Sequence, residues 1–254
     1  FEELNFRPKN VVTTVSNNNL IIRNLEIPVM PEEELAEAIK WEAEDQLPLP
    51  VSHISMDYLI LERDEDEEEM RILMVAVKND VIDSFVSTLE SISLSPKVVN
   101  AQPMALLSLL EYQEELNGPV AIINIGASST QFTIGEKDDI VLSRTIDIGG
   151  DNFTRTLIES MDMDYEEAED YKKEEGISEI QWDNTEEEEE DEFLDSIDMT
   201  TSGITSSEDY LSSLASNLAE EVSRSLNFYS MNHQGQTVDR VYITGGGSKL
   251  KGIN

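Results

Sequence analysis

The chain is 254 residues long, and its 17 basic and 54 acidic side chains give it a formal net charge of −37. A surface this negative repels phosphates, so nucleic acid is excluded as an expected partner and anionic lipid is disfavoured. The chain has no cysteine, which rules out disulfides, thiolate metal sites and cysteine nucleophiles, and no apolar stretch approaches the roughly 18 residues of a membrane span.

The acidity is spread along the chain rather than confined to its two longest acidic runs, residues 64–69 and 186–192. Removing these thirteen carboxylates still leaves a net charge of −24. A surface of one sign stays soluble but repels itself at low salt, and dissolved ions screen that repulsion. We therefore expect the protein to work in a salt-rich cell interior. The length fits one large domain or two small ones.

The first hundred residues predict a small α+β unit. Strands are expected at 11–15 and 20–27, and Pro31 opens a helix whose apolar face repeats at helical spacing. This face comprises Leu35, Ala38, Ile39, Ala43 and Leu47. Two strands, a helix capped by Asn79 or Asp80, and a short strand follow at 55–61, 70–77, 79–91 and 98–99. The order β-α-β-β-α-β over residues 20–100 describes a compact unit of its own.

A different pattern begins after an apolar helix over residues 101–116. Three strand-like runs separated by tight turns predict a meander at 120–124, 130–134 and 140–147. A helix begins near Asn152, and the charged stretch after it is expected to be helical with a solvated acidic end. A long amphipathic helix over 207–229 then leads to a last strand at 238–244.

Two glycine-containing loops, each directly after a buried strand, are candidate ligand sites. The first is Asn124-Ile-Gly-Ala-Ser-Ser-Thr130, where Gly126 and Ala127 bring the backbone close to a ligand and Ser128, Ser129 and Thr130 add hydroxyl donors. The second comprises Gly245, Gly246, Gly247, Ser248 and Lys249. In this loop Ser248 is expected to cap a helix whose N-terminus receives phosphate or ribose. Taken singly, each loop is also explained as an ordinary tight turn.

Few other residues are candidates for catalysis or ligand binding. By helical angle, Glu42 falls inside the apolar stripe of the first helix, so this carboxylate is expected to have a partner or to lie at an interface. The plainer alternatives are a structural ion pair and a shallowly buried edge of the stripe. Trp41 lies off the stripe and is either an exposed anchor for a partner or partly packed. The two histidines, His53 and His233, lie in loop-like contexts, so neither a Ser-His-Asp triad nor a histidine metal site is expected.

Together these residues resemble the actin-like ATPase superfamily. The first loop resembles its second phosphate loop, and Val241-Tyr-Ile-Thr-Gly-Gly-Gly-Ser-Lys-Leu resembles its adenosine loop. Between them, Ala168-Glu169-Asp170-Tyr171-Lys172 resembles the A-E-x-x-K helix of the superfamily, whose Glu and Lys approach the ribose and base. The resemblance implies an α/β, actin-like (ribonuclease H-like) ATPase fold that binds ATP or ADP with Mg.

Three longer segments narrow the resemblance to the PilM family of type IV pilus assembly. They are Leu25-Glu-Ile-Pro-Val-Met-Pro-Glu-Glu-Glu-Leu, Ile39-Lys-Trp-Glu-Ala-Glu-Asp-Gln-Leu-Pro and Ser143-Arg-Thr-Ile-Asp-Ile-Gly-Gly-Asp-Asn-Phe-Thr154. The resemblance covers essentially the whole chain and implies three parts. These are a partial first large subdomain (1–19 and 99–118), an inserted small α+β subdomain (20–98), and a second, nucleotide-binding domain (119–254) with an acidic insertion at about 160–205.

The resemblance also implies a cytoplasmic scaffold that is held at the inner membrane through protein partners. Its expected partner is the short N-terminal cytoplasmic peptide of the inner-membrane protein PilN, bound in a groove between the first domain and the inserted subdomain. With other pilus assembly components, the scaffold would couple the motor to the membrane complex. A first phosphate loop before Phe1 and closing helices after Asn254 are expected to be missing, so nucleotide binding by this chain is expected to be weak or absent.

One position departs from the superfamily, because Asp is usual where this chain has Asn124. Asn keeps the size and one acceptor oxygen but loses the charge that helps to hold Mg²⁺ through water, so very slow or absent hydrolysis is expected. The alternatives are an active ATPase of the actin or chaperone type, a filament-forming FtsA-like division protein, and the related cytoplasmic domain of type II secretion.

Overall fold

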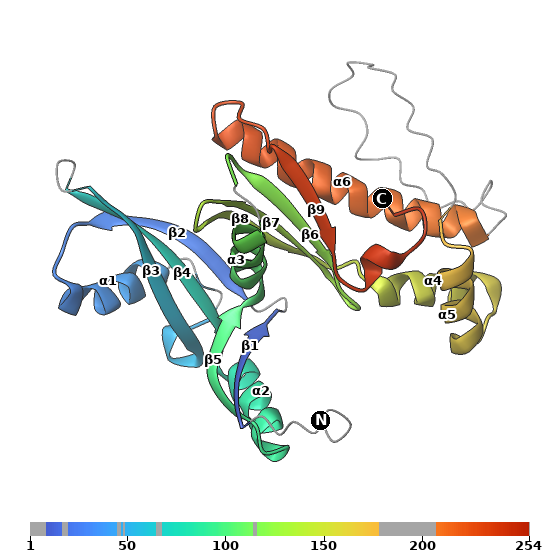
Figure 1. Cartoon of the computed structure of the whole chain (residues 1–254), viewed down its shortest axis with the longest axis horizontal. Helices are drawn as coiled ribbons and strands as arrows, with labels where there is room; N and C mark the ends of the chain where they lie inside the picture. Colours follow the sequence, from blue (N-terminus) through green and yellow to red (C-terminus); the bar gives the residue numbers. More distant parts are fainter. Residues whose placement is uncertain are drawn as a thin grey trace. The chain divides into compact units, whose positions relative to one another are not determined.

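The computed structural model describes residues 9–16, 20–44, 47, 49–64, 68–113, 116–177 and 207–253 (Figure 1). The chain forms two compact units, each with its own internal contacts. The first comprises Phe1–Ile123, Gln131–Thr145 and Phe228–Tyr242, and the second comprises Asn124–Thr130, Ile146–Asn227 and Ile243–Asn254. The acidic segment at 183–192 lies outside the described residues. The three-part division implied by the family resemblance stays a prediction.

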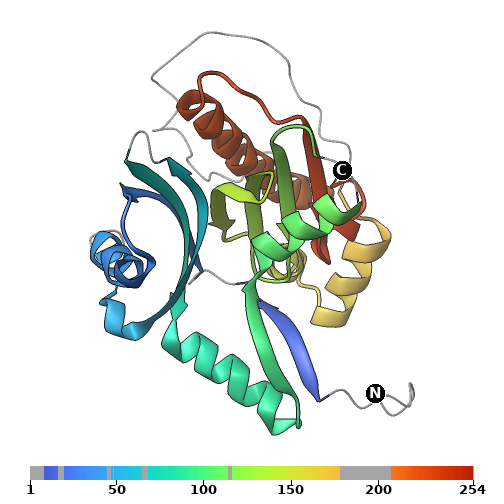
Figure 2. The same cartoon turned by 60° about the vertical axis from the view of Figure 1, so that its left-hand side comes forward.

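A three-stranded antiparallel sheet with a helix against one face opens the first unit (Figure 2). Strand β4 (Glu69–Lys78) is central, between β2 (Ile21–Pro28) and β3 (Ile54–Asp64). Helix α1 (Glu32–Glu44) follows Pro31 and carries three glutamates in its first turn, where the helix dipole favours anions. Its buried side chains pack in one core with those of the sheet, and this core includes Leu25, Ile27, Leu35, Ile39, Ala43, Ile72 and Met74.

The end of helix α1 differs from the angular prediction for Glu42. Only Leu35, Ile39 and Ala43 are buried on this helix, and Glu42 is exposed. Four residues advance the angle by 40°, so the buried face has turned past Glu42 by the last turn, and the predicted place of this carboxylate inside the apolar stripe was wrong. Trp41 is 70% exposed, so of the two alternatives for this side chain, the structure favours the exposed one.

Two parallel strands and two helices complete the first part of this unit. Strand β1 (Asn10–Val15) pairs with β5 (Ser95–Ala101), which is longer than the predicted strand at 98–99. Between β3 and α1 lies the short turn η1 (Val51–His53). Helix α2 (Asn79–Ser91) precedes β5, and helix α3 (Gln102–Gln113) follows it. The predicted order β-α-β-β-α-β is therefore confirmed.

The predicted cap of helix α2 was wrong. Its N-cap residue is Lys78, and no side chain bonds to the cap. The amide of Asn79 instead donates to the carbonyl of Ser52 at 3.1 Å and accepts from the hydroxyl of Ser55 at 2.8 Å. Asn79 thus ties the start of the helix to the neighbouring chain, because a short amide side chain can satisfy other backbone groups as readily as its own helix.

A four-stranded sheet in the order β8-β7-β6-β9 contains the predicted meander. Its strands are β6 (Val120–Ile125), β7 (Thr130–Glu136), β8 (Asp139–Ile146) and β9 (Arg240–Thr244). Strands β6 and β7 are almost wholly buried. This is expected of the near-continuous apolar run of β6, whereas β7 buries polar residues such as Gln131 and Thr133. The meander and the last strand are confirmed, and the sheet leaves both glycine-containing loops at strand ends.

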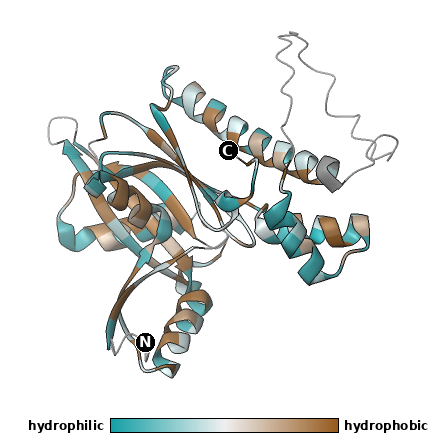
Figure 3. Ribbon diagram, turned by 45° about the vertical axis from the view of Figure 1, so that its right-hand side comes forward, coloured by the Kyte–Doolittle hydropathy of each residue, from teal (hydrophilic) through white to brown (hydrophobic). Residues whose placement is uncertain are grey.

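Helices make up much of the described part of the second unit, and the last of them ends in residues of the first unit. Helix α4 (Gly150–Met161) is followed by α5 (Tyr165–Glu174), whose N-cap Asp164 accepts from Glu167 N at 2.9 Å in a capping box. Helix α6 (Ser207–Asn232) carries hydrophobic and hydrophilic residues interspersed along its coloured part (Figure 3). The core of the unit joins Phe153, Leu157, Ala168, Leu211 and Leu250. Among the helices that the structure describes, none is both long and apolar enough to cross a membrane.

Candidate ligand-binding site

The two glycine-containing loops and helix α5 meet at one cavity of about 430 Å³ in the second unit. We call it the α5 cavity. Its lining residues are Gly126, Ala127, Gly150, Asp151, Phe153, Tyr165, Glu169, Lys172, Lys173, Gly246, Gly247, Lys249 and Leu250. Seven of the thirteen residues selected from the sequence are among them: Gly126, Ala127, Glu169, Lys172, Gly246, Gly247 and Lys249. A cavity of this size can hold a cofactor-sized ligand.

The first loop is held against the start of helix α4. Gly126 N donates to Ser129 O at 2.9 Å, which closes the turn, and Gly150 N donates to Gly126 O at 2.9 Å. Asp151 N also donates to Ala127 O, at 2.7 Å. A side chain at Gly149 would lie 2.5 Å from the Ala127 carbonyl oxygen, so this glycine permits the close approach of helix and loop.

Four residues of the first loop do not line the cavity. Thr130 is completely buried and its hydroxyl donates to Ile148 O at 2.7 Å. This hydroxyl is therefore bonded to the backbone rather than available to a ligand. Ser128 is exposed and Ser129 half-buried, both outside the cavity wall. Asn124 lies beside the second loop, because a side chain built at Gly245 would be 2.6 Å from Asn124 Oδ1.

The second loop departs from the predicted helix cap. Gly245 has a φ of +91°, a conformation that glycine adopts at little cost, and neither it nor Ser248 lines the cavity. The chain then makes a single short turn, η3 (Gly247–Lys249), with Gly246 as its N-cap. Ser248 lies within this turn and its hydroxyl donates back to Gly245 O at 2.7 Å. The predicted cap was wrong, because the Ser248 hydroxyl bonds to the preceding Gly245 carbonyl within a turn that ends at Lys249.

An ion pair on helix α5 forms one wall of the α5 cavity. Lys172 Nζ donates to Glu169 Oε1, to Thr154 Oγ at 2.6 Å and to Gly150 O at 3.3 Å. The side chains of Glu169 and Lys172 are only 18% and 15% exposed. Lys173 Nζ lies 3.6 Å from Glu169 Oε2 and is 65% exposed. The pair therefore links α5 to the start of α4.

The surroundings of Glu169 keep it ionised. Burial would raise the pKa of its carboxyl, but hydrogen bonds from Lys172 and Thr154 and the charges of Lys172 and Lys173 together lower it below the ordinary 4.5. At neutral pH the α5 cavity thus contains three lysines and two carboxylates, Asp151 and Glu169. It is a locally positive site on a chain of net charge −37.

Six lining residues were missed by the sequence reasoning: Gly150, Asp151, Phe153, Tyr165, Lys173 and Leu250. A signal existed for the glycine pair at 149–150, which ends the meander and opens a helix. Lys173 follows the A-E-x-x-K motif directly. Nothing in the local pattern indicated Tyr165, because its position at the cavity depends on how α5 packs against α4.

No cluster of three or more histidine, aspartate or glutamate side chains suited to a metal ion occurs in the described part of the chain. The exposed ring of His53 lies 3.2 Å from the hydroxyl of Ser52, and His233 stacks on Tyr229 with ring centroids 4.3 Å apart.

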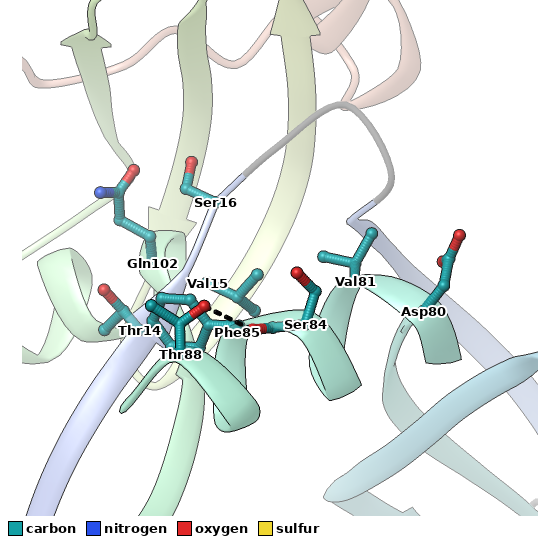
Figure 4. Close-up of a pocket in the computed structure, with 9 residues that line it drawn as sticks. All are labelled: Thr14, Val15, Ser16, Asp80, Val81, Ser84, Phe85, Thr88 and Gln102. Carbon is teal, nitrogen blue, oxygen red and sulfur yellow. Dashed lines mark hydrogen bonds between the residues drawn. The ribbon is translucent and has the colours of Figure 1, made fainter. Parts of the chain in front are cut away.

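A second cavity, of about 720 Å³, lies in the first unit (Figure 4). We call it the β1–α2 groove. Its lining residues are Thr14, Val15, Ser16, Asp80, Val81, Ser84, Phe85, Thr88 and Gln102. Hydroxyls, an amide and the Asp80 carboxylate line it together with Val and Phe side chains, and Thr88 donates to Ser84 O at 2.8 Å. The groove thus offers both hydrogen-bonding groups and small apolar surfaces.

Comparison with known proteins identifies the family. A family model described as type IV pilus assembly protein PilM matches residues 1–187. The chain belongs to the PilM family. A model of the cell division protein FtsA also matches residues 121–254. The predicted actin-like α/β fold is confirmed, and the protein is an actin-like protein of type IV pilus assembly.

This chain matches part of the length of two relatives. A solved structure described as the PilM-PilN type IV pilus biogenesis complex matches with a TM-score of 0.78 and 26% identity, over 99% of this chain and 67% of that chain. FtsA of Bacillus subtilis (strain 168) is 25% identical over 182 residues, which are 68% of this chain and 40% of FtsA. The chain therefore spans less than half the length of this relative.

Proposed function

We propose that this PilM-family chain is a nucleotide-binding adaptor of type IV pilus assembly rather than a turnover enzyme. It would bind ATP or ADP with Mg in the α5 cavity and the N-terminal cytoplasmic peptide of a PilN-like inner-membrane protein. The observation that carries the proposal is the match over 99% of the chain to a protein solved in a PilM-PilN complex. The adaptor would act in the cytoplasm and reach the inner membrane through this and other pilus assembly partners.

The charge of the α5 cavity supports an anionic ligand. Lys172, Lys173 and Lys249 come together on a chain with only 17 basic residues. Bare glycines at 126, 246 and 247 allow phosphate or ribose to approach the backbone. Lys173 and Lys249 can donate to ligand oxygens and Glu169 can accept from ligand hydroxyls, which are the groups that a nucleotide presents.

Asn124 supports slow or absent hydrolysis. Phosphoryl transfer to water depends on groups that position water and metal near the phosphate, and a neutral amide does this less well than a carboxylate. An active ATPase of the actin or chaperone type remains the second candidate. Steady Mg-dependent phosphate release from the protein over many turnovers would favour that candidate over the adaptor.

The β1–α2 groove is the proposed peptide site. Its walls come from residues 14–16 and 102, which belong to the proposed first subdomain, and from residues 80–88 of the proposed inserted subdomain. An extended peptide could bond to the hydroxyls of Thr14, Ser16 and Thr88 and pack apolar side chains on Val81 and Phe85. The acidic surface would favour a basic residue in the peptide, which makes association sensitive to salt.

The test has separate arms for nucleotide and peptide. Calorimetry with ATP, ADP and Mg measures the first, and fluorescence anisotropy with a labelled PilN-like N-terminal peptide measures the second. Ser84→Arg fills the groove with a long side chain and should abolish peptide binding. Ser87→Arg is the matched control, because Ser87 lies on the same helix but does not line the groove. Equal peptide affinity in both variants would contradict the groove assignment.

A further inference from the structure

The hydroxyl of Thr154 lies at the centre of the ion pair in the α5 cavity. Thr154 belongs to helix α4 and is 2% exposed. Its Oγ lies 2.5 Å from Glu169 Oε1 and 2.6 Å from Lys172 Nζ. A hydroxyl has one proton to donate and lone pairs that accept, so it can donate to the carboxylate and accept from the ammonium at the same time.

We propose that Thr154 is a positioning residue, which fixes Glu169 and Lys172 in the orientation that the α5 cavity presents to its ligand. The inference rests on the proposed nucleotide binding, since it concerns the same site. Thr154 does not line the cavity. It acts through the two α5 side chains that do, and it ties them to the helix that also holds the first loop.

The hydroxyl proton has one competing acceptor. The carbonyl oxygen of Gly150 lies 3.2 Å from Thr154 Oγ, the usual back-bond of a threonine within a helix. The carboxylate of Glu169 is nearer and charged, and charge-assisted hydrogen bonds are shorter and stronger than neutral ones. The proton therefore goes to Glu169, and Gly150 O receives the Lys172 ammonium at 3.3 Å instead.

Loss of the hydroxyl would alter the pair in a defined direction. In Thr154→Val the carboxylate loses a donor, so its charged form is less stabilised and the pKa of Glu169 rises. Lys172 loses one of its three acceptors and keeps Glu169 and Gly150 O. The charged groups that also face Glu169 or share its cavity are Lys172 and Lys173 on α5, Asp151 on α4 and Lys249 on η3.

The experiment compares the full chain with Thr154→Val, Thr154→Ser and Thr133→Val. Carboxyl-carbon NMR, with Glu169→Gln to assign the signal, measures the pKa of Glu169 without ligand, and calorimetry measures ADP affinity. We expect Thr154→Val to raise the pKa of Glu169 and to weaken ADP binding about tenfold. Thr154→Ser should keep both values. Thr133 is also buried but lies on β7, so Thr133→Val controls for loss of any buried threonine hydroxyl.

The outcomes separate this inference from the proposed function. An unchanged Glu169 pKa in Thr154→Val overturns it, and so does a raised pKa with full ADP affinity. Failure of Thr154→Ser to restore the pKa also counts against it, since serine keeps the hydroxyl. If the wild-type chain binds no nucleotide, the proposed function fails separately. A raised pKa in Thr154→Val then still supports the positioning of the pair, and an unchanged pKa overturns it.

Discussion

Replacing Lys172 by Met tests how much the ion pair of the α5 cavity stabilises the fold. Lys172 bonds to Glu169, to Thr154 Oγ at 2.6 Å and to Gly150 O at 3.3 Å, and its side chain is 15% exposed. Met keeps the apolar stem but removes the charge and all three bonds. Because Glu169 is left partly buried with weaker partners, we expect the free energy of unfolding to fall by about 1–3 kcal/mol at pH 7.

This loss should depend on pH. Burial would raise the pKa of Glu169, but its bonds to Lys172 and Thr154 and the nearby lysine charges lower it from 4.5. A carboxylate with a lowered folded-state pKa stabilises the fold above its unfolded pKa, and this contribution disappears as pH falls through the folded pKa. The difference between wild type and Lys172→Met should therefore be full at neutral pH and shrink below pH about 4.

Lys173→Met is the matched control, because Lys173 also faces Glu169 but is 65% exposed at a distance of 3.6 Å. An exposed pair of this kind contributes about 0–1 kcal/mol. Urea denaturation followed by circular dichroism, at neutral and acidic pH, measures all three proteins. Equal losses in the two variants would refute the reasoning, as would a Lys172→Met loss that is the same at both pH values.

Three further changes have defined outcomes. Asn124→Asp should increase Mg-dependent phosphate release from bound ATP, and an unaltered turnover would contradict the role given to the amide. Gly245→Ala should cost at least about 1–2 kcal/mol in urea denaturation, because Gly245 has a φ of +91° and a methyl group would meet Asn124 Oδ1. The melting temperature should rise with KCl, since ions screen a net charge of −37; a flat curve would argue against the salt-rich interior.

Most of the fold could be predicted from periodicity and turn chemistry. The apolar spacing of α1 and the alternation of burial in β2 are local properties, so the chain order of helices and strands in the first unit followed directly. The errors concern short polar side chains. Asn79 and Ser248 were both expected at helix caps, but Asn79 bonds to Ser52 O and Ser248 bonds to Gly245 O. The choice between such partners depends on the fold around the residue, which the local sequence does not specify.

The candidate site was predicted in outline but not in its contacts. The motifs located both loops and the α5 pair, because glycines and an A-E-x-x-K pattern are readable in the sequence. The motifs did not show that the Thr130 hydroxyl donates a hydrogen bond to Ile148 O, nor that Tyr165 lines the α5 cavity. Both contacts depend on packing between segments far apart in the chain. The sequence alone does not show which of several hydroxyls or aromatic rings will make such a contact.

The opposing charges of the chain and the α5 cavity predict an unusual salt dependence of nucleotide binding. A nucleotide is repelled at long range by the net charge of −37 and attracted at short range by Lys172, Lys173 and Lys249. The screening length is about 10 Å at 0.1 M salt and about 3 Å at 1 M, so added KCl weakens the distant repulsion before the local contacts. Affinity for ADP, measured by calorimetry, should therefore rise with KCl at first and fall only at higher salt. A steady fall from the lowest KCl concentration would show that local attraction dominates throughout and would contradict this account.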